Sequence, residues 1–243
     1  MNKPWISGPK ELIKHAIAHL HGKSSDFDLR IAFISIDNGV EVMIKTYLGL
    51  PRRVKDIPSP TRRELESAFG FPDILDLLEK FAPQHLEGIE LGEIEWYHRI
   101  RNSLYHDGNG ITVEKKHVET YLGLAKILFE NLFQEKLEDL KSDRQISSNE
   151  VYLEKWLELE RRIWTMGLNS GIRKVQYRHG GMVATELKEK GLISDNDYNE
   201  ILKIFKLRNG LAHGSNLSPD TVQYEMTKVQ NLIDKFPDWR KKE

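Results

Sequence analysis

The 243-residue sequence contains no cysteine, which excludes disulfides, zinc–thiolate sites and cysteine nucleophiles. It has no apolar run long enough to span a membrane, and its first residues, MNKPWISGPKELIKH, lack the apolar stretch of a signal peptide. Neither sign of charge is in clear excess, because the formal net charge is −1. Bulk electrostatics therefore do not indicate a nucleic-acid-binding protein. From these absences we expect a cytoplasmic protein that has no membrane partner.

The residues that are present form a pattern of amphipathic helices. Hydrophobic residues make up 39% of the chain and charged residues 30%, which is typical of a globular protein with a modest core. Apolar residues recur at spacings of three and four along most of the sequence, and no strand pattern competes with them. We therefore expect an all-α protein. Its helices are predicted over residues 9–22, 26–48, 61–81, 92–106, 112–140, 149–168, 182–190 and 195–213, with a last helix that follows residue 218.

Two of these helices have recognisable start signals. Thr112 is expected to cap the helix that continues to about Leu140. Ser218 is expected to cap the last helix, because Pro219 follows it at the first helical position.

A polar segment separates the predicted helices into two groups. Residues 141–150, KSDRQISSNE, lack helical periodicity. We place the domain boundary there and predict two helical domains, over residues 1–140 and residues 141–243, of which the second is shorter.

One short motif occurs twice. Residues 101–106 read RNSLYH and residues 208–213 read RNGLAH, so four of six positions are identical. The match extends upstream, where a glutamate and an isoleucine precede each arginine at the same distances. The identical pairs are Glu93 and Glu200, Ile94 and Ile201, Arg101 and Arg208, Asn102 and Asn209, Leu104 and Leu211, and His106 and His213. A string that recurs within a matching helical pattern indicates an internal repeat.

Each repeated arginine lies in the middle of an apolar helix face. At 100° per residue, four apolar or aromatic positions fall within about 60° of it on the helical wheel. These are Ile94, Tyr97, Leu104 and Tyr105 in the first copy and Ile201, Ile204, Leu211 and Ala212 in the second. A guanidinium on a packed face needs an anion. One interpretation is a buried ion pair, with Asp37, Glu41, Glu158 or Glu160 as partners; the other is a site that receives a phosphate.

Two further groups of residues are candidates for binding. The segment PRRVKDIPSPTRR, residues 51–63, is either a solvated loop between helices or an edge that contacts RNA phosphates. Its basic residues are Arg52, Arg53, Lys55, Arg62 and Arg63. His15, His19 and His21 have a helical spacing that could hold a metal, but no carboxylate completes a known metal-binding pattern around them. We predict no metal and no cofactor.

The repeated motif resembles that of the HEPN superfamily (higher eukaryotes and prokaryotes nucleotide-binding). The family motif is R-x(4–6)-H at the end of a helix in a small bundle, usually with Asn, Asp or His directly after the arginine. RNSLYH and RNGLAH both fit it, and the similarity covers most of each half. Many members are metal-independent endoribonucleases in which two domains pack with their motif helices along one cleft. The resemblance implies two HEPN-like helical bundles in tandem, with both motif helices facing a shared cleft.

The chemistry of RNA cleavage needs the residue types that the motif supplies. RNA carries its own nucleophile, the 2′-hydroxyl, so cleavage requires a proton acceptor, a proton donor and positive charge on the phosphorane. We expect His106 and His213 to fill the first two roles and Arg101 and Arg208 the third. Asn102 and Asn209 would orient the histidines or contact the phosphate. The products would be a 2′,3′-cyclic phosphate and a 5′-hydroxyl.

Two functions from different classes remain open. The first is an RNA-cleaving enzyme of prokaryotic phage defence or a toxin–antitoxin system, whose partner besides RNA would be an antitoxin or regulatory protein. The second is a non-catalytic HEPN-like module that binds RNA or scaffolds a protein complex. The cleft would form either within one chain or in a homodimer that pairs like motifs.

Overall fold

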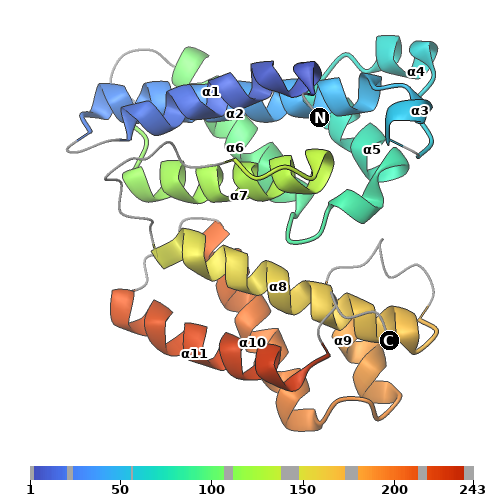
Figure 1. The fold of residues 1–243 in the computed structure, drawn as a ribbon. Helices are drawn as coiled ribbons and strands as arrows, with labels where there is room; N and C mark the ends of the chain where they lie inside the picture. Colours follow the sequence, from blue (N-terminus) through green and yellow to red (C-terminus); the bar gives the residue numbers. More distant parts are fainter. Residues whose placement is uncertain are drawn as a thin grey trace. The chain divides into compact units, whose positions relative to one another are not determined.

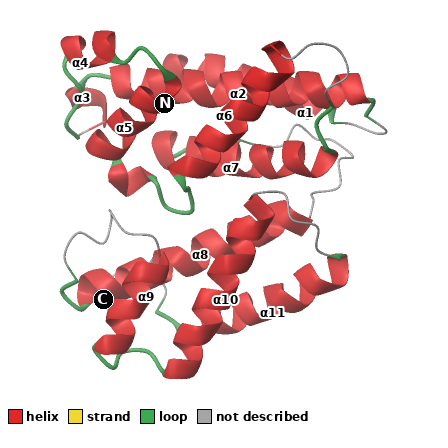
Figure 2. Ribbon diagram, turned by 180° about the vertical axis from the view of Figure 1, so that it is seen from behind, coloured by secondary structure: helices red, strands yellow, loops and turns green. Residues whose placement is uncertain are grey.

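The computed structural model describes residues 3–20, 24–55, 57–106, 112–137, 148–172, 180–212 and 218–237. Within its helices, the side chains of residues 105, 106, 148–150, 212 and 219 lie outside that description. The described secondary structure is helical, and these ranges contain no strand (Figure 2), which confirms the predicted all-α class. Among the described helices, none is both long and apolar enough to cross a membrane.

The chain divides into two compact units, Met1–Gln145 and Ile146–Glu243. The first unit contains two short 3-10 helices, η1 and η2, and seven α-helices within its described part (Figure 1). They are η1 Pro4–Ile6, α1 Ser7–His19, α2 Asp26–Gly49, α3 Arg52–Lys55, α4 Arg62–Ser67, α5 Phe71–Phe81, η2 Pro83–His85, α6 Leu91–His106 and α7 Lys115–Phe133. The second unit contains α8 Ser148–Asn169, α9 Gly180–Glu189, α10 Asp195–Ala212 and α11 Pro219–Lys235.

Helix α2 is the centre of the first unit, because α1, α5, α6 and α7 all pack against it. Gly39 allows α1 to approach closely, since a Cβ at this position would lie 2.7 Å from Cδ1 of Ile13. On another side of α2, the ring of Phe33 meets Tyr97 of α6 and Tyr121 of α7, whose rings stack with centroids 4.4 Å apart. All three rings are fully buried. This aromatic cluster fixes α6, the first motif helix, against α2 and α7.

The second unit is built around α8, which contacts α9, α10 and α11. Its core includes Tyr152 and Trp156 of α8 together with Ile201, Ile204 and Leu211 of α10, all nearly inaccessible to solvent. The second motif helix, α10, therefore has its predicted apolar face packed into the core.

The start of the last helix is confirmed by the structure. The Ser218 side chain accepts a hydrogen bond from the backbone N–H of Thr221, and Pro219 is the first residue of α11. Pro219 suits this position because a first-turn N–H has no helical partner in any case.

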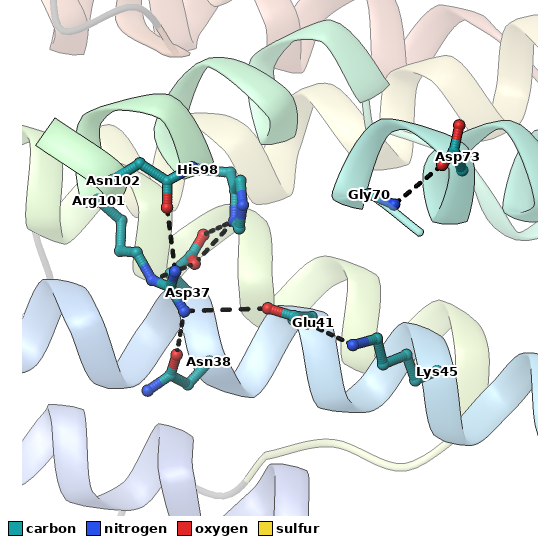
Figure 3. Close-up of polar contacts among 9 residues, drawn as sticks. All are labelled: Asp37, Asn38, Glu41, Lys45, Gly70, Asp73, His98, Arg101 and Asn102. Carbon is teal, nitrogen blue, oxygen red and sulfur yellow. Dashed lines mark hydrogen bonds and ion pairs between the residues drawn. The ribbon is translucent and has the colours of Figure 1, made fainter. Parts of the chain in front are cut away.

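Three other boundaries were predicted wrongly. The single helix expected over residues 61–81 is two helices, α4 and α5, because Pro72 has no N–H and is tolerated only in a first helical turn. Gly70 precedes α5, and its N–H donates to the Asp73 carboxylate (Figure 3). Thr112 does not cap the following helix: α7 begins three residues later, after Glu114. It also ends at Phe133, short of the predicted end near Leu140, because Gln134 has a left-handed backbone with φ 52°, a common way for a helix to terminate.

Candidate active site

Arg101 lies on the packed face of α6 and points toward α2 (Figure 3). Its neighbours Ile94, Tyr97 and Leu104 are buried, while its own side chain keeps 21% of its surface exposed. Its Nε lies 3.2 Å from Oδ2 of Asp37, and one terminal nitrogen donates to Oδ1 of Asn38 at 2.8 Å. The ion-pair interpretation of Arg101 is therefore realised in the structure.

Asp37, on α2, contacts two side chains of α6, those of Arg101 and His98, and one side chain of α7, that of Tyr121. Its carboxylate is fully buried, and the Tyr121 hydroxyl of α7 donates to Oδ1 at 2.8 Å. Nδ1 of His98, on α6, lies 3.0 Å from Oδ2 and 3.3 Å from Oδ1 (Figure 3). Burial, followed by the adjacent Asp37 charge, raises the pKa of Tyr121 well above its usual value, so this hydroxyl remains a donor. Asp37 thus holds α6 and α7 to α2 at one point.

The charges around Arg101 are nearly balanced. Glu41, one turn after Asp37 on α2, lies 3.9 Å from Arg101 through Oε2 and pairs with Lys45 through Oε1. Two carboxylates, of Asp37 and Glu41, therefore face two basic side chains, of Arg101 and Lys45. The side chains of His98, Arg101 and Glu41 are partly exposed, whereas that of Asp37 is inaccessible, so solvent reaches the edge of this cluster but not its centre.

The second motif helix repeats one contact of the first. In α10 a terminal nitrogen of Arg208 donates to Oδ1 of Asn209 at 3.3 Å, just as Arg101 donates to Oδ1 of Asn102 at 3.0 Å. The two arginines differ in burial, because only 1% of Arg208 is exposed.

Glu158 and Glu160, two of the acidic residues weighed as partners of the motif arginines, make contacts within the second unit. Oε1 of Glu158 lies 2.9 Å from Nε of Arg162. Oε1 of Glu160 accepts from the backbone N–H of Gly180 at 2.7 Å, at the start of α9.

The motif histidines lie at the edge of the described structure. His106 is the last residue of α6, but its side chain is outside the described residues, as is the whole of His213. The structure describes each unit but not the position of one relative to the other, so the shared cleft stays a prediction. Among the six predicted catalytic residues, the structure brings together the two neighbouring Arg–Asn pairs.

The basic segment forms the start of two short helices. Arg52 and Arg53 lie in α3, Arg62 and Arg63 open α4, and all four side chains are exposed. Arg62 pairs with Glu66 one turn later. These four arginines have the exposure that contact with a phosphate backbone would require, whereas their role in RNA binding stays a prediction.

Lys55, the fifth basic residue of the segment, is turned inward. Its ammonium donates to the carbonyls of Tyr47 and Leu48 at 2.9 and 3.2 Å, at the end of α2. It also lies 4.9 Å from the centroid of the Tyr47 ring. Burial lowers the pKa of Lys55 to about 8. In this structure Lys55 caps the C-terminal end of α2 by bonding two of its last carbonyls.

His98 is a candidate functional residue that the sequence analysis missed. It stands three residues before Arg101, which places it about 60° away on the same helix face. The ring of Phe71, from α5, stacks on its imidazole with centroids 4.0 Å apart and planes 17° apart. The helical wheel carries the signal for His98, but its contact with Asp37 depends on tertiary packing.

Asp37, Glu41 and His98 are close enough together to be considered as metal ligands, because one ligand atom from each lies within 4.8 Å of the others. The guanidinium of Arg101 contacts both carboxylates. A permanent cation therefore already neutralises the oxygens that a metal would need, and Lys45 shares the second of them. This donor set fits an ion pair better than a metal centre.

The histidines weighed as metal ligands in the sequence have protein partners. Nδ1 of His15 lies 3.1 Å from Oγ of Ser35, and Nδ1 of His19 lies 3.2 Å from Oδ1 of Asp28. The third, His21, lies outside the described residues.

Comparison with known proteins found no matching family model, no matching curated protein and no matching solved structure.

Proposed function

We propose that this chain is a metal-independent endoribonuclease built from two HEPN-like helical bundles. The observation that carries the proposal is the repeated Arg–Asn pair. On α6 and again on α10, an arginine on a packed helix face donates to the asparagine that follows it. In the sequence, a histidine stands four residues after each asparagine. In the proposal both motif helices line one cleft, within a chain or between two chains of a dimer.

The proposed reaction uses the 2′-hydroxyl of RNA as the nucleophile. One motif histidine, His106 or His213, takes its proton, and the other gives a proton to the leaving 5′-oxygen. Arg101 and Arg208 stabilise the charge of the phosphorane. Of the two motif arginines, Arg101 is the more exposed, with 21% of its side chain accessible against 1% of Arg208. The first contact with phosphate is therefore assigned to Arg101. A prokaryotic defence or toxin role follows from the resemblance alone.

A second function is favoured by specific contacts. Arg101 already pairs with two carboxylates, and Arg208 is almost inaccessible to solvent. Buried or half-buried ion pairs can hold helices together without any catalytic role. In this alternative the chain is a non-catalytic module that binds RNA or a protein partner.

Cleavage of labelled RNA in EDTA separates the two functions. Wild-type protein should yield fragments with 5′-hydroxyl ends and 2′,3′-cyclic phosphates, and a 2′-deoxy substitution at the cleaved position should block the cut. His106→Ala and His213→Ala should each lower the rate on the order of a hundredfold or more, as loss of a general acid or base does. Arg101→Ala should lower it at least as much.

A matched control keeps this test specific. His19→Ala removes a histidine that pairs with Asp28 outside the motif, and it should leave cleavage unchanged. Thermal melts of every variant report folding. Full activity in both motif-histidine variants, or RNA binding without cleavage by the wild type, would support the non-catalytic module.

A further inference from the structure

We infer that His98 is the proton-accepting catalytic residue of the first unit and that Asp37 is the residue that positions it. This inference rests on the proposed ribonuclease function and changes one role in it: His98, which lies outside the repeated motif, replaces a motif histidine as the base, and the motif histidines keep the role of proton donor.

The geometry selects one form of the imidazole. An ionised carboxylate only accepts hydrogen bonds, and both contacts of Asp37 with the ring go to Nδ1. Nδ1 of the neutral ring therefore carries the proton, which leaves the lone pair on Nε2. The described residues offer His98 no other hydrogen bond or ion pair. A buried carboxylate on one ring nitrogen with the other nitrogen available is the arrangement by which proteins hold a histidine as a general base.

The ring is held still and remains accessible. Phe71 stacks on one face of the imidazole, so rotation about its bonds would break both this contact and the bond to Asp37. The side chain nevertheless keeps 12% of its surface exposed, whereas Asp37 keeps none.

His98, the proposed base, and Arg101, the proposed phosphate-binding residue, both contact the carboxylate of Asp37. Oδ2 of Asp37 is 3.0 Å from Nδ1 of His98 and 3.2 Å from Nε of Arg101. An arginine that holds a phosphate therefore has the imidazole beside it. The ionisable groups around His98 are Asp37 and Glu41 from α2, Arg101 from its own helix and, through Asp37, Tyr121 from α7; α5 contributes the apolar ring of Phe71.

The proposed reaction moves two protons, one to His98 and one from a motif histidine. Nε2 of His98 takes the proton of the 2′-hydroxyl while the 2′-oxygen bonds to phosphorus. The bond from phosphorus to the 5′-oxygen breaks, and that oxygen takes a proton from a motif histidine, His106 or His213. His98 is left as an imidazolium, which the Asp37 charge stabilises, and both histidines exchange protons with water before the next reaction.

The second motif helix lacks this feature. The residue three positions before Arg208 is Phe205, whose ring packs against Trp156 with centroids 5.7 Å apart. The base is thus assigned to the first unit.

The dependence of cleavage rate on pH tests the inference. A general base must be unprotonated, so wild-type rates should rise with pH at the acid side of the profile. His98→Gln should lose this rising limb and lower the rate on the order of 10²- to 10⁴-fold. In His98→Ala, free imidazole should restore part of the rate in proportion to its unprotonated fraction. Asp37→Asn should lower the rate and keep the rising limb.

A second histidine–aspartate pair provides the control. His19 contacts Asp28 through Nδ1 at 3.2 Å, as His98 contacts Asp37, but it lies on α1. His19→Gln should leave both rate and profile unchanged. Thermal melts separate loss of folding from loss of catalysis, and imidazole rescue would not occur if His98 had a structural role alone.

The outcomes separate this inference from the proposed function. If the wild type cleaves RNA and His98→Gln keeps the rising limb, the inference is overturned and the proposed ribonuclease stands, with a motif histidine as its base. If EDTA abolishes wild-type cleavage and Mn²⁺ restores it, the reaction depends on a metal and both assignments fall. If the wild type does not cleave RNA under any of these conditions, both fall together.

Discussion

Replacing Asp37 by asparagine should destabilise the first unit by about 3 kcal/mol. The two side chains have nearly the same shape, so packing is preserved, while the change removes the negative charge and replaces one accepting oxygen by an NH2 donor. Removing one partner of a buried ion pair typically costs about 3 to 5 kcal/mol, because the other charge is left uncompensated. The lower end applies here, since Arg101 is 21% exposed and keeps Glu41 at 3.9 Å. Tyr121→Phe removes a single hydrogen bond to a charged acceptor and should cost less, about 2 kcal/mol.

A double-mutant cycle isolates the Asp37–Arg101 interaction from these separate losses. Arg101→Met leaves a carboxylate at full burial and should also cost about 3 kcal/mol. The double variant Asp37→Asn, Arg101→Met leaves neither charge unpaired. Its destabilisation should therefore fall short of the sum of the single effects by at least about 1.5 kcal/mol.

Urea unfolding followed by far-ultraviolet circular dichroism and by tryptophan fluorescence measures these differences. Two probes are needed because a chain with two compact units need not unfold in one step. The losses should appear only in the transition of the first unit. Single effects that add to within about 0.5 kcal/mol would show that the two side chains do not interact, and would refute the account of Asp37 as the anchor of Arg101.

Two further predictions concern Lys55 and Ser218. Burial lowers the pKa of Lys55 from 10.5 to about 8, so between these values the unfolded chain binds a proton that the folded chain does not, and the unfolding free energy of the wild type relative to Lys55→Met should rise with pH across that window. Urea unfolding of both proteins at pH 7.5, 9 and 10 checks this, and a constant difference would contradict it. Ser218→Ala removes the side-chain acceptor of the Thr221 N–H and should destabilise the second unit by about 1 kcal/mol, while Ser218→Asp should retain most of the stability. Thermal melts measure both, and equal losses in the two variants would show that the cap contributes little.

The helical class could be predicted because it depends on local spacing. Apolar residues three and four apart predict the helices and the buried faces of α6 and α10. Ser218 and Pro219 predict where the last helix begins, because a cap bonds only to nearby backbone. Pro72 carried an equally local signal for the break between α4 and α5. Because the apolar periodicity continues across this break, the sequence predicted a single helix over residues 61–81.

The centre of the candidate site could be predicted only in part. The apolar surroundings of Arg101 show that it needs an anion, and Asp37 was one of several acidic residues that could supply it. Which one does so depends on how α2 and α6 pack, and this packing brings together residues 61 positions apart, as the contact between Asp37 and His98 shows. The same packing brings His98, a histidine outside the motif, into contact with Asp37.

The two copies of the motif differ in a way that stability does not explain. A buried ion pair is often no more stabilising than apolar side chains of the same shape, so packing alone gives no reason to keep an arginine at the same place on α6 and α10. The shared bond from arginine to the next asparagine indicates a common task for both helices. Their surroundings differ, because Arg101 has His98 before it and 21% exposure, whereas Arg208 has Phe205 before it and 1% exposure. Such unequal halves suit the proposed reaction, which takes a proton at one place and gives one at another.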